Sequence, residues 1–285
     1  MQKIWVCGAR GQIGQAVNDV VDKLEFEMLD TDVDDLDVTD TDEVLRFGEM
    51  NRPDIIINCS GMTDISFCEE NPSQAFKVNA LGARNLAIVA AKMQAKMVQL
   101  STDDVFDGKS TEPYTEFDIT NPGTVYGKSK LAGENYVKEF TTKHFIVRST
   151  WVYGKGQNFI NGFLKKVDAG EQLSIASDQF GSPTSANELA RFLLHLVHTS
   201  EYGTYHATNK GVCSRYAFAQ EILKMTGKTA SMQPVPTVMS DFSKVRPAYA
   251  VLDNFIMSMV PIYDFPDWQD SLREYLEERG LYHAE

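Results

Sequence analysis

The chain has 285 residues, of which 43% are hydrophobic and 24% are charged, and these proportions are typical of folded globular proteins. Its 27 basic and 40 acidic residues give a formal net charge of −13, which argues against a nucleic-acid backbone or an anionic membrane as the main partner. No apolar run approaches the roughly 18 residues that cross a bilayer. A small anionic ligand is compatible with this charge, because helix N-termini bind phosphate through backbone N–H groups.

The cysteines and histidines give no sign of a metal site. Four cysteines lie far apart, without a C-x-x-C pair, at positions 7, 59, 68 and 213. This spacing fits neither a disulfide framework nor a zinc site, and the five histidines are dispersed as well, so we expect no bound metal. The N-terminal segment lacks the basic and apolar regions of a secretory signal. We therefore expect a cytoplasmic protein with free thiols.

Residues 1 to about 150 alternate short apolar runs with amphipathic stretches, which is typical of β-α units that form a parallel sheet. The expected strands are Lys3–Cys7, Phe26–Asp30, Asp54–Cys59, Lys96–Ser101 and His144–Arg148. The expected helices are Gln12–Lys23, Thr41–Asn51, Pro72–Met93 and Tyr126–Phe140. Because parallel crossovers are right-handed, this order predicts an α/β fold with a Rossmann-like, doubly wound parallel sheet.

The sequence changes character after Trp151. It becomes rich in Gly, Asn, Ser and Thr, with helical apolar spacing over 187–199, 215–226 and 268–279. This half predicts a smaller, loop-rich α/β C-terminal domain for the substrate, over residues 154–285. Residues 1–153 would form the dinucleotide-binding Rossmann domain, completed by part of 185–208. No linker separates the two halves, so we expect them to be interleaved around a cleft.

The first expected strand runs into a G-x-x-G-x-x-G turn formed by Gly8, Gly11 and Gly14. The first glycine permits the tight turn, the second lets a pyrophosphate approach the backbone, and the third lets helix pack on strand. The helix then presents unpaired N–H groups to the phosphates. An ordinary loop is the alternative, but the position between strand and helix favours dinucleotide binding. The other turn residues expected beside the cofactor are Arg10, Gln12 and Ile13.

The choice of dinucleotide depends on residues after the second expected strand. Asp30 and Asp32 lie near the distance of about 20 residues beyond the glycines at which a carboxylate binds the adenosine ribose and favours NAD(H). Arg10 argues the other way, because a guanidinium can pair with the 2′-phosphate of NADP(H). The preference between NADH and NADPH stays open, as does the alternative that both aspartates are solvated charges of the acidic segment 30–42.

A Y-x-x-x-K pattern, Tyr126 and Lys130, stands at the start of an expected helix. Residues four apart share one helix face, and a neighbouring ammonium lowers a tyrosine pKa from its usual value of about 10. Tyr126 is therefore a candidate general acid. Taken alone, such a pair is more often a surface pair. Its coincidence with the glycine turn, and with Ser101-Thr102-Asp103 at the end of the fourth strand, favours catalysis instead.

With these motifs the chain resembles the extended short-chain dehydrogenase/reductases, and within them the dTDP-4-dehydrorhamnose reductases. The resemblance covers nearly the whole chain and includes the segments 36–39, 52–54, 101–108, 148–154, 178–184 and 203–206. It implies that NADH or NADPH delivers hydride to the C4 keto group of a nucleotide-linked 6-deoxy-4-ketohexose. That reaction would convert dTDP-4-dehydro-L-rhamnose to dTDP-L-rhamnose.

The resemblance also implies roles for single residues. Tyr126 would be the proton donor, Lys130 would hold the nicotinamide ribose, and Thr102 would hydrogen-bond the reacting oxygen. Further cofactor contacts are implied for Asp37, Val38, Ser60, Gly61 and Met62. Further substrate contacts are implied for Asp103, Trp151 and Arg246. A packing role in the core is the alternative for Trp151.

Two segments depart from the family pattern. Asp104 stands where the family carries tyrosine, and residues 60–67 lose two ionisable positions and gain Asp64. Asp104 either places a carboxylate near the pocket or points to solvent. Two other functions therefore stay open: a reductase or epimerase of another sugar nucleotide, and a non-catalytic, cofactor-binding regulatory subunit. We expect a nucleotide sugar as partner and neither nucleic acid nor membrane, while the exact sugar and the formation of a homodimer are left undecided.

Overall fold

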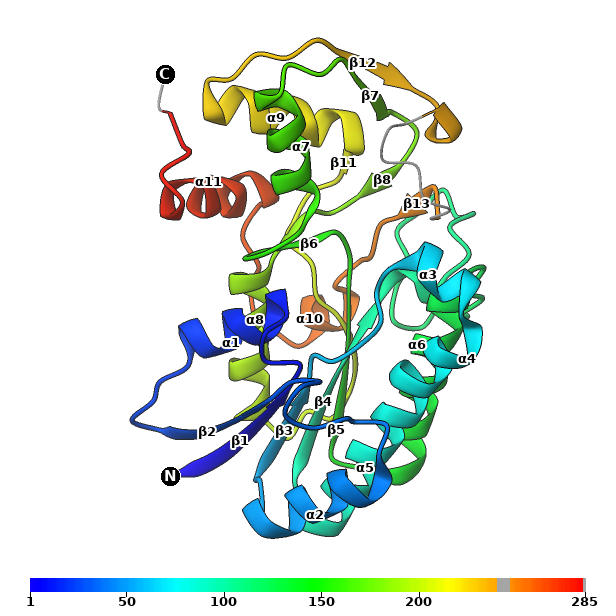
Figure 1. Cartoon of the computed structure of the whole chain (residues 1–285), viewed down its shortest axis with the longest axis vertical. Coiled ribbons are helices and arrows are strands. Elements are labelled where there is room, and N and C mark those ends of the chain that lie inside the picture. Colours follow the sequence, from blue (N-terminus) through cyan, green and yellow to red (C-terminus); the bar gives the residue numbers. More distant parts are fainter. Residues whose placement is uncertain (240–246, 284–285) are drawn as a thin grey trace.

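A computed structural model describes residues 1–239 and 247–283 of the chain. Its centre is a six-stranded parallel sheet in the order β10-β5-β4-β3-β1-β2 (Figure 1). The strands are β1 (Gln2–Cys7), β2 (Phe26–Thr31), β3 (Ile55–Asn58), β4 (Lys96–Thr102), β5 (His144–Ser149) and β10 (Gly203–His206). All carboxyl ends therefore lie at one edge of the sheet, and the topological switch point lies between β1 and β3.

Helices cover both faces of this sheet. One face carries α1 (Gln12–Val20) and α8 (Ala186–Val197), and the other carries α2 (Thr41–Asn51), α5 (Ala83–Met93) and α6 (Val125–Phe140). In β3, Ile55 and Ile57 pack into the core on the α8 side, and Ile56 packs into the core on the α5 side. Strands buried on both faces are apolar throughout. The predicted doubly wound α/β fold is confirmed.

The helix expected over 72–93 is not uniform. It consists of α4 (Pro72–Phe76), a π-helical segment η1 (Lys77–Gly82) and α5. A helix that the sequence analysis did not predict, α3 (Ile65–Glu70), precedes it. The carboxylate of Asp64 caps α3 by accepting from the Phe67 N–H at 3.0 Å. Asp64, which departs from the family pattern, thus has a structural role as a helix cap.

The second half adds a smaller lobe beyond the carboxyl end of β5 (Figure 1). Aromatic side chains, among them Phe163, Phe218 and Trp268, fill its core. Its helices are α7 (Phe159–Asp168), α9 (Arg215–Thr226), η3 (Thr237–Met239) and α11 (Trp268–Glu278), whereas α10 (Phe255–Met259) packs against β10 and the core on the α8 side of the large sheet. Its strands pair as β6 (Val152–Tyr153) with β9 (Thr184–Ser185), β7 (Leu173–Ala176) with β12 (Met232–Val235), and β8 (Phe180–Gly181) with both β11 (Cys213–Ser214) and β13 (Tyr249–Ala250).

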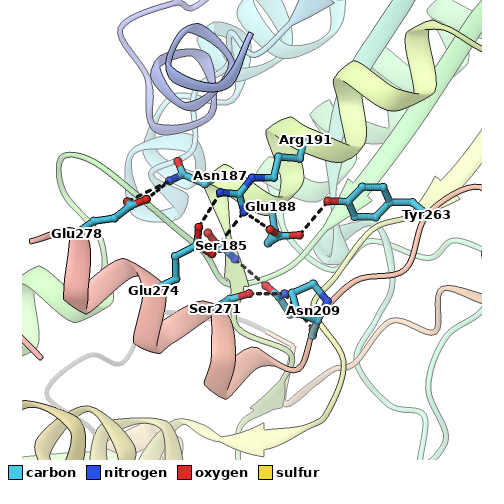
Figure 2. Close-up of polar contacts among 10 residues, drawn as sticks. Ser185, Asn187, Glu188, Arg191, Asn209, Tyr263, Ser271, Glu274 and Glu278 are labelled. Atoms are coloured by element: carbon cyan, nitrogen blue, oxygen red, sulfur yellow. Dashed lines mark hydrogen bonds and ion pairs between the residues drawn. The ribbon is translucent and has the colours of Figure 1, made fainter. Parts of the chain in front are cut away.

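The chain passes between the lobes more than once. After a first excursion through α7 and β7, it returns as α8, which packs against α1, and as β10, which pairs in parallel with β5. Figure 2 shows how polar side chains join α8 and the segment after β10 to α11. The contacts are those of Arg191 with Glu188 and Glu274, Asn187 with Glu278, Asn209 with Ser185 and Ser271, and Tyr263 with Glu188.

Arg191→Met is expected to lower the free energy of unfolding by about 1 kcal/mol. The reason is that the half-exposed guanidinium joins Glu188 of α8 to Glu274 of α11, with the second contact at 2.6 Å. Denaturant unfolding measures the change. Arg273→Met is the matched control, because Arg273 contacts Asp270 of its own helix at an exposed position. An equal loss in both variants would show that the contact between α8 and α11 contributes nothing specific.

Candidate active site

The glycine turn after β1 lies directly against the loop after β3. Gly8 has a φ of +76°, and a Cβ at this position would lie 2.7 Å from the backbone nitrogen of Ser60. A Cβ on Gly14 would collide with the carbonyl oxygen of Gly8. Both positions therefore require glycine, one for its backbone conformation and both for space. Because glycines have no side chain, the backbone of this turn can contact a ligand at the switch point, where doubly wound sheets bind nucleotides.

Helix α1 begins in this turn without a side-chain cap, because its N-cap residue is Gly11. The first N–H groups of a helix without a cap are available to an anion. Gln12, the first residue of α1, has a buried Oε1 that meets no hydrogen-bond donor within residues 1–239 and 247–283. Ile13 is partly buried against the core of the α8 side. Open backbone, uncapped N–H groups and an orphaned amide oxygen together fit a dinucleotide at this position.

The acidic segment after β2 holds the glycine turn from the other side. A carboxylate oxygen of Asp32 accepts from the Arg10 backbone N–H at 2.8 Å. The Arg10 guanidinium pairs with Asp34 at 2.8 Å and with Asp35 at 2.9 Å. Asp30 is exposed near the end of β2. The structure thus brings Arg10 and Asp32 together, but it also neutralises the cation that would bind a 2′-phosphate.

Asp37 and Val38 lie at the end of the same segment. The Asp37 carboxylate accepts from the Thr39 N–H at 2.8 Å, which closes a local turn. Val38 is buried in the core on the α5 side, and its carbonyl accepts from Asn85 at 3.0 Å. The side chain of Val38 therefore packs in the protein, and only its exposed neighbour Asp37 offers a side chain to a ligand here.

Residues 60–62 connect the loop after β3 to the π-helical segment η1. Ser60 donates from its hydroxyl to the Asn58 side chain at 2.5 Å. The backbone N–H of Met62 donates to Asn79 Oδ1 at 2.8 Å, and Asn79 Nδ2 donates to the Met62 carbonyl at 3.0 Å. A Cβ on Gly61 would lie 3.6 Å from the Lys130 ammonium. This loop therefore lies beside the helix that carries Tyr126 and Lys130.

Asn79 is a site residue that the sequence analysis missed. It is 2% exposed, and its Nδ2 also donates to the Ser129 hydroxyl at 2.9 Å, which in turn donates to the Tyr126 carbonyl at 2.7 Å. Asn79 thus ties the loop after β3 to the first turn of α6. In the sequence, Asn79 is only one polar residue within a long helical stretch. In the structure it lies in the π-helical segment η1 and is buried, and such segments often occur at functional sites.

Helix α6 carries Tyr126 and Lys130 one turn apart, as the spacing predicts. Thr124 caps the helix by accepting from the Gly127 N–H at 2.9 Å. Tyr126 is 7% exposed and Lys130 is 5% exposed, so neither belongs to a surface pair. Burial lowers the pKa of Lys130 to about 8, although the charges of Glu134 and Cys59 raise it. At neutral pH the side chain therefore remains mostly cationic.

The Tyr126 ring is enclosed by the two elements that follow β3. Ile65 and Cys68 of α3 and Ala75 of α4 form one cluster with it, and Met62 packs against this cluster. Enclosure by apolar groups reduces water contact around the phenol and strengthens electrostatic interactions there. The unpredicted helix α3 therefore forms one wall around the proposed acid.

Thr102, Asp103 and Asp104 stand at the end of β4 and in the 3-10 turn η2 (Asp103–Val105). The Thr102 hydroxyl donates to Asp103 Oδ1 at 3.0 Å and accepts from the Asp104 N–H at 3.2 Å. The three residues are at most 5% exposed. A Cβ on Gly127 would collide with the Asp104 carbonyl, so η2 packs directly on the first turn of α6. The alternative that Asp104 points to solvent is wrong.

Trp151 follows β5 with a φ of +47°, an uncommon backbone conformation for a bulky residue. A Cβ on Gly181 would lie 2.6 Å from its indole, and the guanidinium carbon of Arg215 lies 3.4 Å from the ring centroid. Gly181 and Arg215 therefore pack closely on the indole, which belongs to the core of the smaller lobe. Trp151 is 9% exposed, so little of its ring is left for a ligand. Arg246 lies outside the described residues.

The described residues also enclose a cavity away from the predicted site. A cavity of about 430 Å³ lies between the segments 208–212, 251–258 and 263–265, and none of the predicted site residues line it. Within 1–239 and 247–283, no three His, Cys, Asp or Glu side chains are grouped to hold a metal ion. In the same part of the chain, every helix is too short or too polar to span a bilayer.

Gly8→Ala is expected to weaken the binding of NADH and NADPH at least tenfold and to lower the melting temperature. The added Cβ would meet the Ser60 backbone, and alanine is strained at a φ of +76°. Fluorescence titration of the reduced cofactor measures the affinity. Gly123→Ala serves as control, because no atom lies within 4 Å of a Cβ there. Parent-like cofactor affinity in a folded Gly8→Ala protein would contradict the assignment of this turn.

Comparison with known proteins places this architecture in a family. The chain matches the model of the RmlD substrate binding domain over residues 1–280. The spore coat polysaccharide biosynthesis protein SpsK of Bacillus subtilis is 35% identical over 281 residues, which cover 98% of this chain and 99% of the relative.

Two solved structures of dTDP-4-dehydrorhamnose reductases have the same fold. That of Clostridium acetobutylicum is 40% identical, and that of Bacillus anthracis, in complex with NADP, is 35% identical. Each has a TM-score of 0.95, and each match covers 98% of this chain and 100% of the other. A family match over residues 1–280 and relatives of this identity over their full length establish that the chain belongs to the family of the RmlD substrate binding domain.

Proposed function

We propose that this protein reduces the C4 keto group of a nucleotide-linked 6-deoxy-4-ketohexose with NADH or NADPH, converting dTDP-4-dehydro-L-rhamnose to dTDP-L-rhamnose. The observation that carries the proposal is the buried pair of Tyr126 and Lys130, one turn apart on α6 and packed against the end of β4. Full-length similarity to dTDP-4-dehydrorhamnose reductases, one of them in complex with NADP, supports the reaction and the cofactor.

In this proposal, residues 1–153, with part of 185–208, hold the dinucleotide. Residues 154–285 hold the sugar nucleotide, together with groups at or just after the ends of β4 and β5 of the larger lobe. The turn from Gly8 to Gly14 would accept the pyrophosphate, with Asp30, Asp32 and Asp37 on the adenosine side. Residues 60–62 and Lys130 would border the nicotinamide half. Thr102, Asp103 and Trp151 would contact the sugar nucleotide, and Arg246 is assigned to the same group from its sequence position alone.

The reduced nicotinamide supplies a hydride when it is bound. The chain itself must provide a proton and hold the substrate. Tyr126 donates its phenolic proton to the oxygen that becomes the C4 hydroxyl, and Lys130 stabilises the phenolate that is left. The Thr102 hydroxyl, which donates to Asp103 Oδ1 in this structure, turns to donate its one hydrogen to the same oxygen and orients the carbonyl. The apolar enclosure of Tyr126 by α3 and α4 excludes water from this transfer.

A cofactor-oxidation assay tests the reaction. The purified protein is supplied with NADH or NADPH and with a panel of nucleotide-linked 4-keto-6-deoxy sugars, and the loss of reduced nicotinamide is followed by absorbance. We expect turnover with the dTDP-linked substrate. Turnover with another sugar nucleotide alone would move the assignment to a related reductase. Cofactor binding without any turnover would favour the regulatory function.

Tyr126→Phe is expected to reduce kcat by at least about 100-fold, because the variant cannot donate a proton. The affinity for NADPH should stay within about twofold, because the ring still packs against α3 and α4. Steady-state kinetics and cofactor titration measure both quantities. Tyr136→Phe on the same helix is the matched control and should keep the parental kcat. Undiminished turnover in Tyr126→Phe would remove Tyr126 from the mechanism.

The same proposal includes a location and an assembly. The reaction would take place in the cytoplasm, a reducing compartment that fits the free cysteines at positions 7, 59, 68 and 213. A homodimer would be the working assembly. Sedimentation of the purified protein decides the second point.

A further inference from the structure

Helix α6 carries a buried ionisable side chain, Glu134, one turn beyond Lys130. Its carboxylate is completely buried. One carboxylate oxygen accepts from the Ser101 hydroxyl at 2.6 Å and from Arg148 Nε at 2.9 Å, and the other accepts from Arg148 Nη2 at 2.7 Å. The Arg148 side chain is only 4% exposed. Glu134 and Arg148 thus form a bidentate ion pair in the protein interior.

Arg148 is held on its remaining sides by neutral groups. Its Nη1 lies 3.5 Å from His206 Nε2, and its guanidinium carbon lies 5.3 Å from the Phe106 ring centroid. Burial lowers the pKa of His206 to about 3, so the imidazole is neutral. Burial raises the pKa of Glu134, but its hydrogen bonds and the charge of Arg148 outweigh this effect and hold it below its usual value. The pair is therefore charged and rigidly placed.

Stabilisation of the fold does not by itself explain a buried ion pair of this kind. Desolvation of both charges usually cancels their attraction, so apolar residues of similar volume would stabilise the fold as well or better. The location of the pair indicates such a role. Ser101 of β4 and Arg148 of β5 are register partners, and the next pair along the strands is Thr102 and Ser149. Glu134 therefore connects α6 to two strands one residue before Thr102.

The same face of α6 carries the reacting groups. Tyr126, Lys130 and Glu134 follow one another at intervals of four residues, which places them in line on one side of the helix. Glu134 is the group that most strongly opposes the loss of the Lys130 proton. The other ionisable groups near Lys130 and Glu134, on α6 and on the elements packed against it, are Tyr126, Cys59, Glu69, Asp103, Asp104, Arg148 and Lys138. The Lys138 ammonium lies 3.6 Å from the Glu134 carboxylate.

We propose that Glu134, held by Arg148 and Ser101, is a positioning residue for the reduction: it fixes the Tyr126–Lys130 face of α6 against the ends of β4 and β5, and its negative charge keeps the Lys130 ammonium protonated during turnover. The inference rests on the proposed function of Tyr126 and Lys130. It assigns to a buried ion pair a part in catalysis that acts through Lys130 and the placement of α6, without direct contact with either ligand.

The test separates charge from folding with two variants. Glu134→Gln alone leaves Arg148 buried without its counter-ion and is expected to destabilise the protein. The double variant Glu134→Gln/Arg148→Met removes both charges together and is the variant to assay. Glu139→Gln, the same chemical change at an exposed position of α6, is the matched control. Thermal unfolding establishes that each protein is folded before kinetics are measured.

In the double variant, Lys130 loses the negative charge that favours its protonated form, so its ammonium gives up the proton at lower pH. We expect the alkaline limb of the kcat profile to move down by about one pH unit. At pH 8, near the pKa of Lys130 in the parent, kcat should fall about fivefold, with KM for the sugar nucleotide within about twofold of the parent value. Glu139→Gln should keep the parental profile. An unchanged alkaline limb in the folded double variant overturns the proposal.

Binding of NADPH as a function of pH gives a readout that needs no sugar substrate. Because Lys130 is proposed to hold the nicotinamide ribose, affinity should decline at a pH about one unit lower in the double variant than in the parent. If the parent reduces no keto-sugar but this shift is found, the proposed function fails and the role of Glu134 stands. If the pH dependence of binding is the same in both proteins, the role of Glu134 fails.

Glu134→Asp decides the matter should the double variant not fold. It keeps the charge but withdraws the carboxylate by one methylene from Arg148 and Ser101. We expect the alkaline limb to stay within about 0.3 pH units of the parent and kcat to fall about fivefold, because the helix face is less well fixed. A parental kcat in Glu134→Asp would contradict a positioning role.

Discussion

Polar groups that are buried must find partners within the protein, and this constraint shapes the whole region around α6. Asn79 bonds the loop after β3, Ser129 bonds the Tyr126 carbonyl, and Glu134 bonds two strands through Arg148 and Ser101. The bonds of Glu134 fix α6 against β4 and β5, and the bond between Asn79 and Ser129 fixes it against η1. These bonds help to hold Tyr126 and Lys130 in place, because both residues lie on the same helix.

The two lobes contribute to the site in different ways. The larger lobe supplies an edge at which parallel strands end together, so the glycine turn, residues 60–62 and Thr102 come from neighbouring strands. The smaller lobe approaches the same edge from β5 onwards. Gly154 lies beside Gln12 at the start of α1, and Lys155 pairs with Asp19 of α1 at 2.6 Å. A ligand between the glycine turn and the smaller lobe would therefore contact both.

In the region where the cofactor is expected to bind, neighbouring carboxylates balance the positive charge of Arg10. Arg10 has the chemistry to bind a 2′-phosphate, yet it pairs with Asp34 and Asp35, and its backbone is held by Asp32. These pairs are exposed and therefore weak, so a phosphate dianion can compete for the guanidinium. The relative from Bacillus anthracis, whose structure holds NADP, shows that this family accommodates the larger cofactor.

The sequence by itself determined those features of the protein that depend on residues close together along the chain. The apolar blocks of the strands, the glycine turn and the four-residue spacing of Tyr126 and Lys130 are local patterns, and each lies where it was predicted. The tertiary structure alone decided which distant groups meet: Asn79 with Ser129, Glu134 with Arg148, and Arg215 on Trp151. A π-helical turn, a left-handed backbone at Trp151 and the burial of Asp104 are likewise set by packing between segments, which no local spacing encodes.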